Sequence, residues 1–235
     1  MTGQGIYAQA LGEDFRKLQP EVQEYFSLLP GSGFYGVGIG VFDVAGCPQP
    51  WLRPLIRTAA AEQAFFPEYG ERIPFQIENH AHLDPFGRAS LTTRRSLSFP
   101  GRNRIFESTS SLVDGRLVDY LGKHRRLVTD LTPSIAPDGA LRAVSDHGRL
   151  FTRQLKLRLP AVVEAKAYAL QWWDADAAQH RIQVKVIHRQ LGVLLVYAGG
   201  FDYRLVRYPA HEAAAHGVPT SLPHPVLPQR WEVRT

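Results

Sequence analysis

The chain has 235 residues, of which 44% are hydrophobic, and carries a formal net charge of +5, so it can bury a substantial core. No run of Lys and Arg exceeds two residues, whereas nucleic-acid-binding proteins usually carry a basic stripe, and we expect no nucleic-acid partner. The single cysteine, Cys47, excludes a disulfide within the chain. No apolar run approaches the roughly 18 residues of a membrane span, and no signal peptide is evident. We expect a cytoplasmic protein that is a monomer or a homodimer.

The first 64 residues predict short helices on either side of one strand. Apolar residues recur at helical spacing, and Pro20 divides them between a short helix and a second one that begins at the proline. The residues of this row are Leu11, Phe15, Leu18, Val22 and Phe26. A further helix is predicted from Pro50 to about Ala64, with Trp51, Leu55 and Ala59 on its buried side.

The segment between these helices predicts a β-strand with one bare face. Alternation places Tyr35 and the β-branched residues on one side and Gly36, Gly38 and Gly40 on the other. Glycine weakens a strand, so three in register indicate that a ligand, a tryptophan or another backbone lies against them. The spacing G-x-G-x-G argues against a phosphate loop, which needs G-x-G-x-x-G before a helix. Internal packing and ligand binding both remain open for Tyr35 and the three glycines.

From residue 73 the hydrophobic period changes to two, which is typical of strands. Strands are predicted near residues 73–83, 88–99, 102–113, 116–121, 124–132, 140–150, 153–158, 164–174, 180–188 and 193–208. Turn sequences such as Pro100-Gly101 and Asp114-Gly115 join successive strands. Such an antiparallel meander tends to curl into a barrel or half-barrel, because closure removes exposed edges.

We therefore predict a mainly β protein, a calycin-like antiparallel β-barrel or half-barrel with short N-terminal helices packed on it. The chain forms one domain, residues 1–235. Residues 1–64 supply the helices and the glycine-rich strand, 65–208 the meander, and 209–235 a loosely ordered tail rich in Pro, His and Ala.

Several short motifs follow one another along the chain, and their order is more informative than any one of them. They are Leu11–Pro20 (LGEDFRKLQP), the glycine-marked strand ending at Gly46, Phe99–Ser108 (FPGRNRIFES), Leu117–Gly122 (LVDYLG), the Leu159-Pro160 step and Leu191–Gly199 (LGVLLVYAG). In this order the chain resembles a bacterial family known as domain-of-unknown-function family 4166. The resemblance implies no activity and no site residues. The three alternating glycines and the Glu-x-His-x-His strand are not expected of the family, so we predict a divergent member with a specialised ligand.

The segment Glu78-Asn79-His80-Ala81-His82 is a candidate metal site. Alternation places Glu78, His80 and His82 on one strand face, and a His-x-His pair can reach one ion. However, Glu78 and His82 lie about 13 Å apart along a strand, so a third ligand would have to come from elsewhere. The alternative is the solvent-facing side of a half-buried strand. We predict no metal and no other cofactor, and keep a metal-dependent enzyme using His80 and His82 as an alternative.

Two ionisable residues lie in otherwise apolar rows. Arg95 shares a face with apolar residues, and a buried arginine needs a partner such as Glu107, Asp202 or an anionic ligand group. His188 ends an apolar row, where it either acts as a general base at a pocket mouth or is satisfied within the core.

Aromatic side chains mark the last strands. Tyr197, Phe201 and Tyr203 share a face, and Trp172 and Trp173 put one indole on each side of their strand. An apolar ring with one hydrogen-bonding tip suits an enclosed apolar ligand that needs a few orienting contacts. The alternative is a plain hydrophobic core.

The sequence shows no G-x-S-x-G elbow, no phosphate-binding loop and no Cys-x-x-Cys pair. We predict a barrel that encloses a large apolar, polyketide-like molecule and acts as a cofactor-independent cyclase or isomerase of natural-product biosynthesis, by cycloaddition or rearrangement. Arg95, His188 and Tyr197 are the catalytic candidates. A non-catalytic carrier of lipophilic ligands is the alternative from another class.

Overall fold

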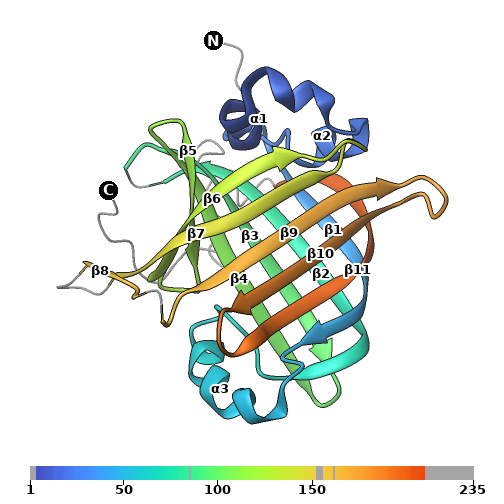
Figure 1. Ribbon diagram of the computed structural model, residues 1–235. Helices are drawn as coiled ribbons and strands as arrows, with labels where there is room; N and C mark the ends of the chain where they lie inside the picture. Colours follow the sequence, from blue (N-terminus) through green and yellow to red (C-terminus); the bar gives the residue numbers. More distant parts are fainter. Residues whose placement is uncertain (1–3, 85, 152–155, 161, 210–235) are drawn as a thin grey trace.

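A computed structural model of the chain describes residues 4–84, 86–151, 156–160 and 162–209 (Figure 1). Within these residues, ten antiparallel strands close into a barrel, which confirms the predicted fold. Residues 210–235 of the predicted C-terminal tail lie outside the described residues, as does the first half of the strand predicted at 153–158. No helix in the described part is long and apolar enough to cross a membrane.

The barrel strands pair in one continuous order, and one extra pairing closes the barrel. Neighbours run β6-β5-β4-β3-β2-β1-β11-β10-β9-β7, and β6 also pairs with β7. The short strand β8 pairs only with the end of β7. The strands are β1 (Phe34–Gly46), β2 (Tyr69–Leu83), β3 (Ala89–Phe99), β4 (Arg102–Val113), β5 (Arg116–Leu121), β6 (Leu127–Ile135), β7 (Leu141–Phe151), β8 (Lys156–Arg158), β9 (Ala165–Asp174), β10 (Gln179–His188) and β11 (Gly192–Arg207).

Short helices cover the two ends of the barrel. The helices α1 (Ile6–Leu11) and α2 (Pro20–Tyr25), with the 3₁₀ helix η1 (Gly12–Lys17) between them, lie at one end (Figure 1). Pro20 begins α2, as predicted. Gln19 fixes this cap to the barrel, because its side chain accepts from the backbone N–H of Trp173 at 2.7 Å and donates to the carbonyl of the same residue at 3.2 Å.

The other end carries η2 (Pro50–Leu52) and α3 (Arg53–Ala61). The predicted orientation of this segment is wrong. Trp51 and Leu55 are 62% and 66% exposed, whereas Leu52 and Ile56 are buried. A second apolar row, offset by one residue, faces the protein instead: Leu52 and Ile56 pack with Cys47 in a small core cluster.

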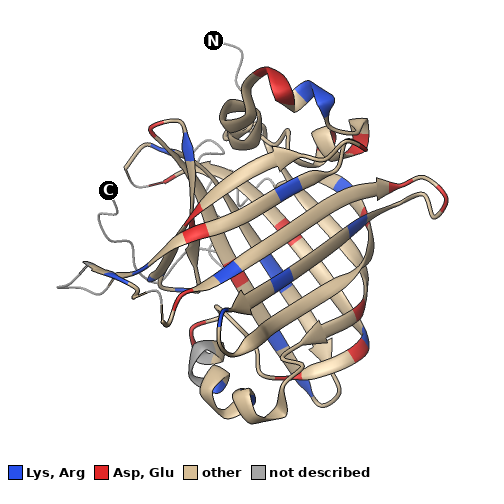
Figure 2. Cartoon of the chain, in the orientation of Figure 1, with Lys and Arg blue, Asp and Glu red and all other residues tan. Residues whose placement is uncertain are grey.

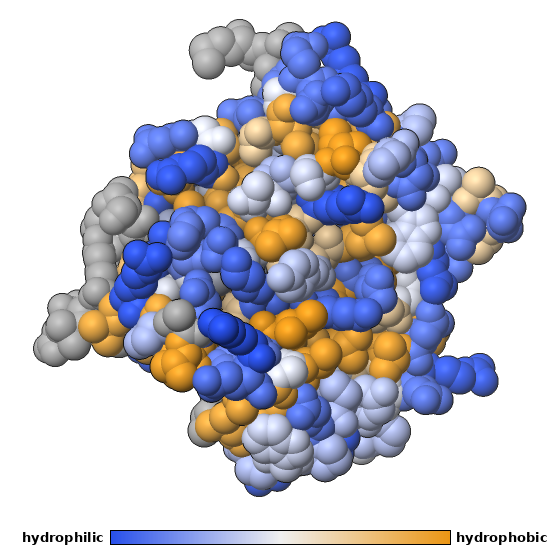
Figure 3. Space-filling view, viewed as in Figure 1, coloured by the Kyte–Doolittle hydropathy of each residue, from blue (hydrophilic) through white to orange (hydrophobic). Residues whose placement is uncertain are grey.

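The core lies inside the barrel because alternate residues of every strand point inward. It includes Phe75, which contacts both Phe42 and Phe201, with the rings of Phe42 and Phe75 stacked at 3.6 Å. Acidic and basic residues are interspersed along the strands (Figure 2). Apolar and polar side chains also alternate over the face shown in Figure 3.

The bare face of β1 points into the barrel and is covered by aromatic rings of β11. A Cβ atom added to Gly36 would overlap the phenol of Tyr203, and one added to Gly38 would lie 2.8 Å from the ring of Phe201. At Gly40 the added atom would meet the backbone carbonyl of Gly200. The bulky neighbours of these glycines are therefore side chains and backbone of the protein itself.

Candidate functional site

The barrel encloses a cavity of about 290 Å³ beneath the N-terminal cap. Its lining comes from nearly every strand and from the cap residues Tyr7, Tyr25 and Phe26. The lining also includes Leu159 and Val163, beside the gap where β7 leaves β9 to pair with β8. Since Val163 is 54% exposed, the cavity reaches the surface at this gap.

The two walls of the cavity differ in character. The wall formed by β9, β10 and β11 is mainly apolar, and it includes a row of three small residues, Ala165, Ala167 and Ala169. The facing wall of β3 to β7 carries most of the polar groups. These are Thr93, Arg95, Ser108, Ser110, Asp119, Thr129 and Ser145. Such a cavity suits a molecule with an apolar body and a few oxygen or nitrogen groups on one side.

Arg95 is the main cationic group of this wall. Its guanidinium lies over the rings of Phe106 and Tyr197, with its Cζ atom 5.3 Å and 5.8 Å from their centroids. Its buried Nε atom has no hydrogen-bond partner among the described residues. Neither expected partner is near the inward face, because Glu107 and Asp202 point outward from β4 and β11. A buried N–H without an acceptor is costly, so this site is complementary to an oxygen acceptor.

Tyr197 also lines the cavity, as the aromatic pattern predicts. Burial raises the pKa of its phenol, although the charge of Arg95 opposes this shift. The hydroxyl therefore stays protonated and can donate a hydrogen bond. Burial likewise raises the pKa of Tyr25 in the cap.

The other sequence candidates lie away from the cavity lining. His188 shapes the β10–β11 turn: its Nε2 lies 2.7 Å from the carbonyl of Val162, and its Nδ1 accepts from the backbone N–H groups of Gln190 and Leu191. His188 is buried with both ring nitrogens engaged, as expected of a satisfied core histidine, and it is not among the described lining residues of the cavity. Tyr35 stacks on His80 with ring centroids 5.1 Å apart.

The remaining aromatic candidates pack beside the cavity. Trp173 lies edge-on to His180, and His180 stacks on Phe201 at 5.3 Å. Tyr203 covers Gly36 and accepts from Asn79 Nδ2 at 3.3 Å. Trp172 lies on the opposite face of β9 and pairs with Arg181 of β10. None of Trp172, Trp173, Phe201 and Tyr203 is among the described lining residues.

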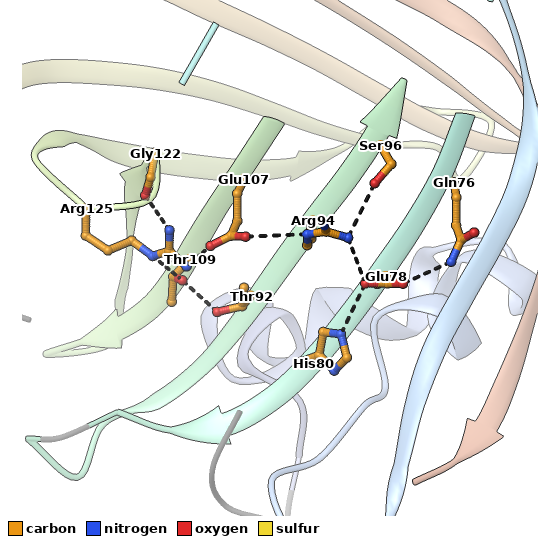
Figure 4. Close-up of polar contacts among 10 residues, drawn as sticks. All are labelled: Gln76, Glu78, His80, Thr92, Arg94, Ser96, Glu107, Thr109, Gly122 and Arg125. Atoms are coloured by element: carbon orange, nitrogen blue, oxygen red, sulfur yellow. Dashed lines mark hydrogen bonds and ion pairs between the residues drawn. The ribbon is translucent and has the colours of Figure 1, made fainter. Parts of the chain in front are cut away.

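The histidine motif lies on the outer face of the barrel, where it is buried within a polar network (Figure 4). Glu78 lies 3.9 Å from His80 Nε2 and 3.5 Å from Arg94, and His80 Nδ1 lies 2.7 Å from Tyr208 Oη. His82 Nε2 lies 3.0 Å from Thr92 Oγ1. The residues that the structure describes contain no group of three or more possible metal ligands. The solvent-facing alternative is wrong, since His80 and His82 are 3% and 2% exposed.

The centre of this network is a buried ion pair. Arg125 is fully buried, and its Nη2 donates to Glu107 Oε1 at 2.6 Å. Its Nε donates to Thr109 Oγ1 at 2.8 Å, and its Nη1 donates to the carbonyl of Gly122. Arg125 belongs to the turn between β5 and β6, so the network holds that turn against the outer face of β4.

Two buried histidines should make the protein sensitive to mild acid. Burial lowers the pKa of both His82 and His180 to about 4. As pH falls from 6.5 towards 4, the unfolded chain takes up protons at these imidazoles and the folded protein does not, so stability decreases. The slope is at most about 1.4 kcal/mol per pH unit for each histidine. We expect Tm to fall over this range, and less steeply in His180→Phe; an unchanged slope in that variant would contradict the assignment.

Sequence reasoning missed two cavity residues, Asp119 and Gln171. Asp119 shares a strand face with Leu117 and Leu121 on β5, a pattern that signals an inward carboxyl group. Gln171 is 5% exposed, and its Nε2 has no hydrogen-bond partner among the described residues. Nothing in the sequence around Gln171 distinguishes it from a surface glutamine.

Comparisons with known proteins agree with the motif order. A model of the family described as "Domain of unknown function (DUF4166)" matches residues 18–201. The chain is also similar to the uncharacterized protein YndH of Bacillus subtilis (strain 168), with 26% identity over 191 residues that cover 80% of this chain and 92% of the relative. No solved structure matches the chain. With most of its length matched by the family model, the chain belongs to the DUF4166 family.

Proposed function

We propose that this protein encloses a compact, largely apolar molecule that carries a carbonyl or similar acceptor, and that it catalyses a cofactor-independent isomerisation or cyclisation of that molecule. The observation that carries the proposal is Arg95, which lines a largely apolar cavity and whose buried Nε–H has no acceptor among the described residues. A cavity of about 290 Å³ lies at the small end of the range for ligand pockets. Folded polyketides, which combine rings with carbonyl groups, are one class of molecule with this chemistry.

The catalytic part of the proposal follows from what the two polar groups of Arg95 and Tyr197 can do. Both donate hydrogen bonds and lie 5.8 Å apart, from Cζ to the ring centroid. Donors fixed in a water-poor cavity stabilise the charge that develops on a carbonyl oxygen during rearrangement. The cavity walls would hold the substrate in its reactive conformer. A non-catalytic carrier would use the same contacts, so binding and turnover must be measured separately.

Binding can be tested with 2-naphthol, a fluorescent probe with an apolar bicyclic body and one oxygen. We expect the purified protein to bind it, and Arg95→Met to weaken binding at least 10-fold, since a hydrogen bond to a charged group contributes about 1.5–3 kcal/mol. Ala167→Phe, which fills the apolar wall, should abolish binding. Arg181→Met is the matched control, because Arg181 pairs with Asp43 on the outer surface. Equal affinity in all four proteins would overturn the proposal.

A further inference from the structure

A carboxyl group lies inside the cavity between two leucines. Asp119 holds the middle inward position of β5 and lines the cavity. Ser110 Oγ donates to its Oδ1 at 2.8 Å. Asp84 and Asp130 each pair with an arginine, but within the described part of the chain no cationic group lies within the 4.0 Å ion-pair distance of Asp119. Its polar contacts are therefore the hydroxyl groups of Ser110 and Ser108, beside the cavity itself.

The register of the sheet determines the separation between Asp119 and Arg95. On β4, Phe106 lies opposite Arg95, and Ser110 lies opposite Asp119. Ser108 lies between these two positions and also lines the cavity. The positions of Phe106 and Ser110 are about 13 Å apart along the strand. Arg95, Ser108 and Asp119 therefore follow one another along this wall of the cavity.

The protonation of Asp119 suits proton transfer. Burial raises the pKa of its carboxyl group, while the hydrogen bond from Ser110 and the charge of Arg95 oppose this shift. A carboxylate whose proton affinity is raised towards neutral pH is a more effective base towards a weakly acidic C–H group. Tyr7 of the cap faces the same carboxyl group: the charge of Asp119 contributes to the raised pKa of its phenol, which also hydrogen-bonds with Ser110.

We infer that Asp119 is the proton-transfer residue of this cavity and that the substrate is an enolisable carbonyl compound. The inference rests on the proposed function, because it places the carbonyl oxygen at Arg95. The Asp119 carboxylate takes a proton from the carbon next to the carbonyl. The C–H electron pair forms a C=C bond, the C=O π pair moves to the oxygen, and Arg95 Nε–H stabilises the enolate. In a β,γ-unsaturated substrate Asp119 then returns the proton to the γ-carbon, whose new C–H bond takes the electron pair of the old C=C bond as the oxygen pair re-forms C=O, so the double-bond shift needs no oxidant or reductant.

The test uses the full-length protein and two probes. The α-protons of 2-tetralone exchange with D₂O through its enolate, and NMR follows this exchange. 2-Naphthol resembles the enol of 2-tetralone and reports binding by fluorescence. We expect the wild-type protein to accelerate exchange and Asp119→Asn to lower the catalysed rate at least 100-fold. Naphthol affinity should change less than 3-fold, because asparagine has nearly the same shape. Asp130→Asn, which changes an outward carboxylate paired with Arg149, should match the wild-type protein.

The two probes distinguish the role of Asp119 from the proposed function of the cavity. Wild-type binding of naphthol with no accelerated exchange, or equal exchange in Asp119→Asn, overturns the role of Asp119 and leaves the proposed cavity function standing. Failure of the wild-type protein to bind naphthol overturns the proposed function together with this inference. Two results together support the role of Asp119. Asp119→Asn loses catalysed exchange but still binds naphthol, and the wild-type exchange rate falls as Asp119 becomes protonated at low pH.

Discussion

Gly40→Ala is expected to lower the free energy of unfolding by about 3 kcal/mol, with a fall in Tm of roughly 10 °C in a chain of this size. The added Cβ would meet the carbonyl oxygen of Gly200 and lie 2.6 Å from Phe201 Cβ. Gly200 and Phe201 are held in the ladder opposite Val41 and Gly40, so neither can move without breaking strand pairing. Thermal unfolding followed by circular dichroism measures the effect, and a Tm within 1–2 °C of wild type would contradict it.

Gly36→Ala is a matched comparison, because its steric conflict is with one side chain. The added Cβ would overlap the phenol of Tyr203. We expect Gly36→Ala to be strongly destabilising in the wild-type protein and to cost less than about 1 kcal/mol in a Tyr203→Ala background, where that ring is absent. Gly40→Ala should remain destabilising in a Phe201→Ala background, since the Gly200 carbonyl is still there. Rescue at both positions would show that ring packing alone requires the glycines.

The strands were predictable because turn residues mark their ends and alternation marks their faces. Arg95 falls in an apolar row and does line the interior. The predicted partners of Arg95 were wrong for a reason that the same alternation supplies: Glu107 lies between Phe106 and Ser108, which line the cavity, and so must point outward. Alternation along each strand therefore identifies which side chains can form an ion pair, provided that the facing direction of both residues is considered.

Burial of the outer polar face could not be read from local sequence. His80 and His82 alternate with apolar residues, as exposed positions of a half-buried strand do. They are buried because distant groups contribute: Tyr208 at the end of β11 reaches His80, and Arg125 from a turn reaches the outer face of β4. The strand predicted to begin at residue 124 begins at Leu127. Arg125 adopts φ 54° in the preceding turn, and a strand cannot continue through that conformation.

Arg125→Met should be among the most destabilising single changes in the chain. It removes the partner of Glu107, whose side chain is 5% exposed, and leaves Arg94 at 3.9 Å as the nearest cation in the described network. Breaking a buried ion pair from one side costs about 3–5 kcal/mol, because the other charge stays buried. We expect Tm to fall by roughly 10–15 °C. Arg149→Met is the control: its partner Asp130 and Arg149 itself are 26% and 29% exposed, so its loss should cost no more than about 1 kcal/mol.

The double variant Arg125→Met/Glu107→Leu separates the two causes of this loss. If the uncompensated charge of Glu107 is responsible, removing it should restore more than half of the lost stability, since apolar replacement of a whole buried pair is often neutral. The hydrogen bonds from Arg125 to Thr109 and to the Gly122 carbonyl are absent from both variants. A double variant as unstable as Arg125→Met alone would therefore show that those bonds, which fold the β5–β6 turn onto the barrel, contribute most of the stability, and the ion pair little.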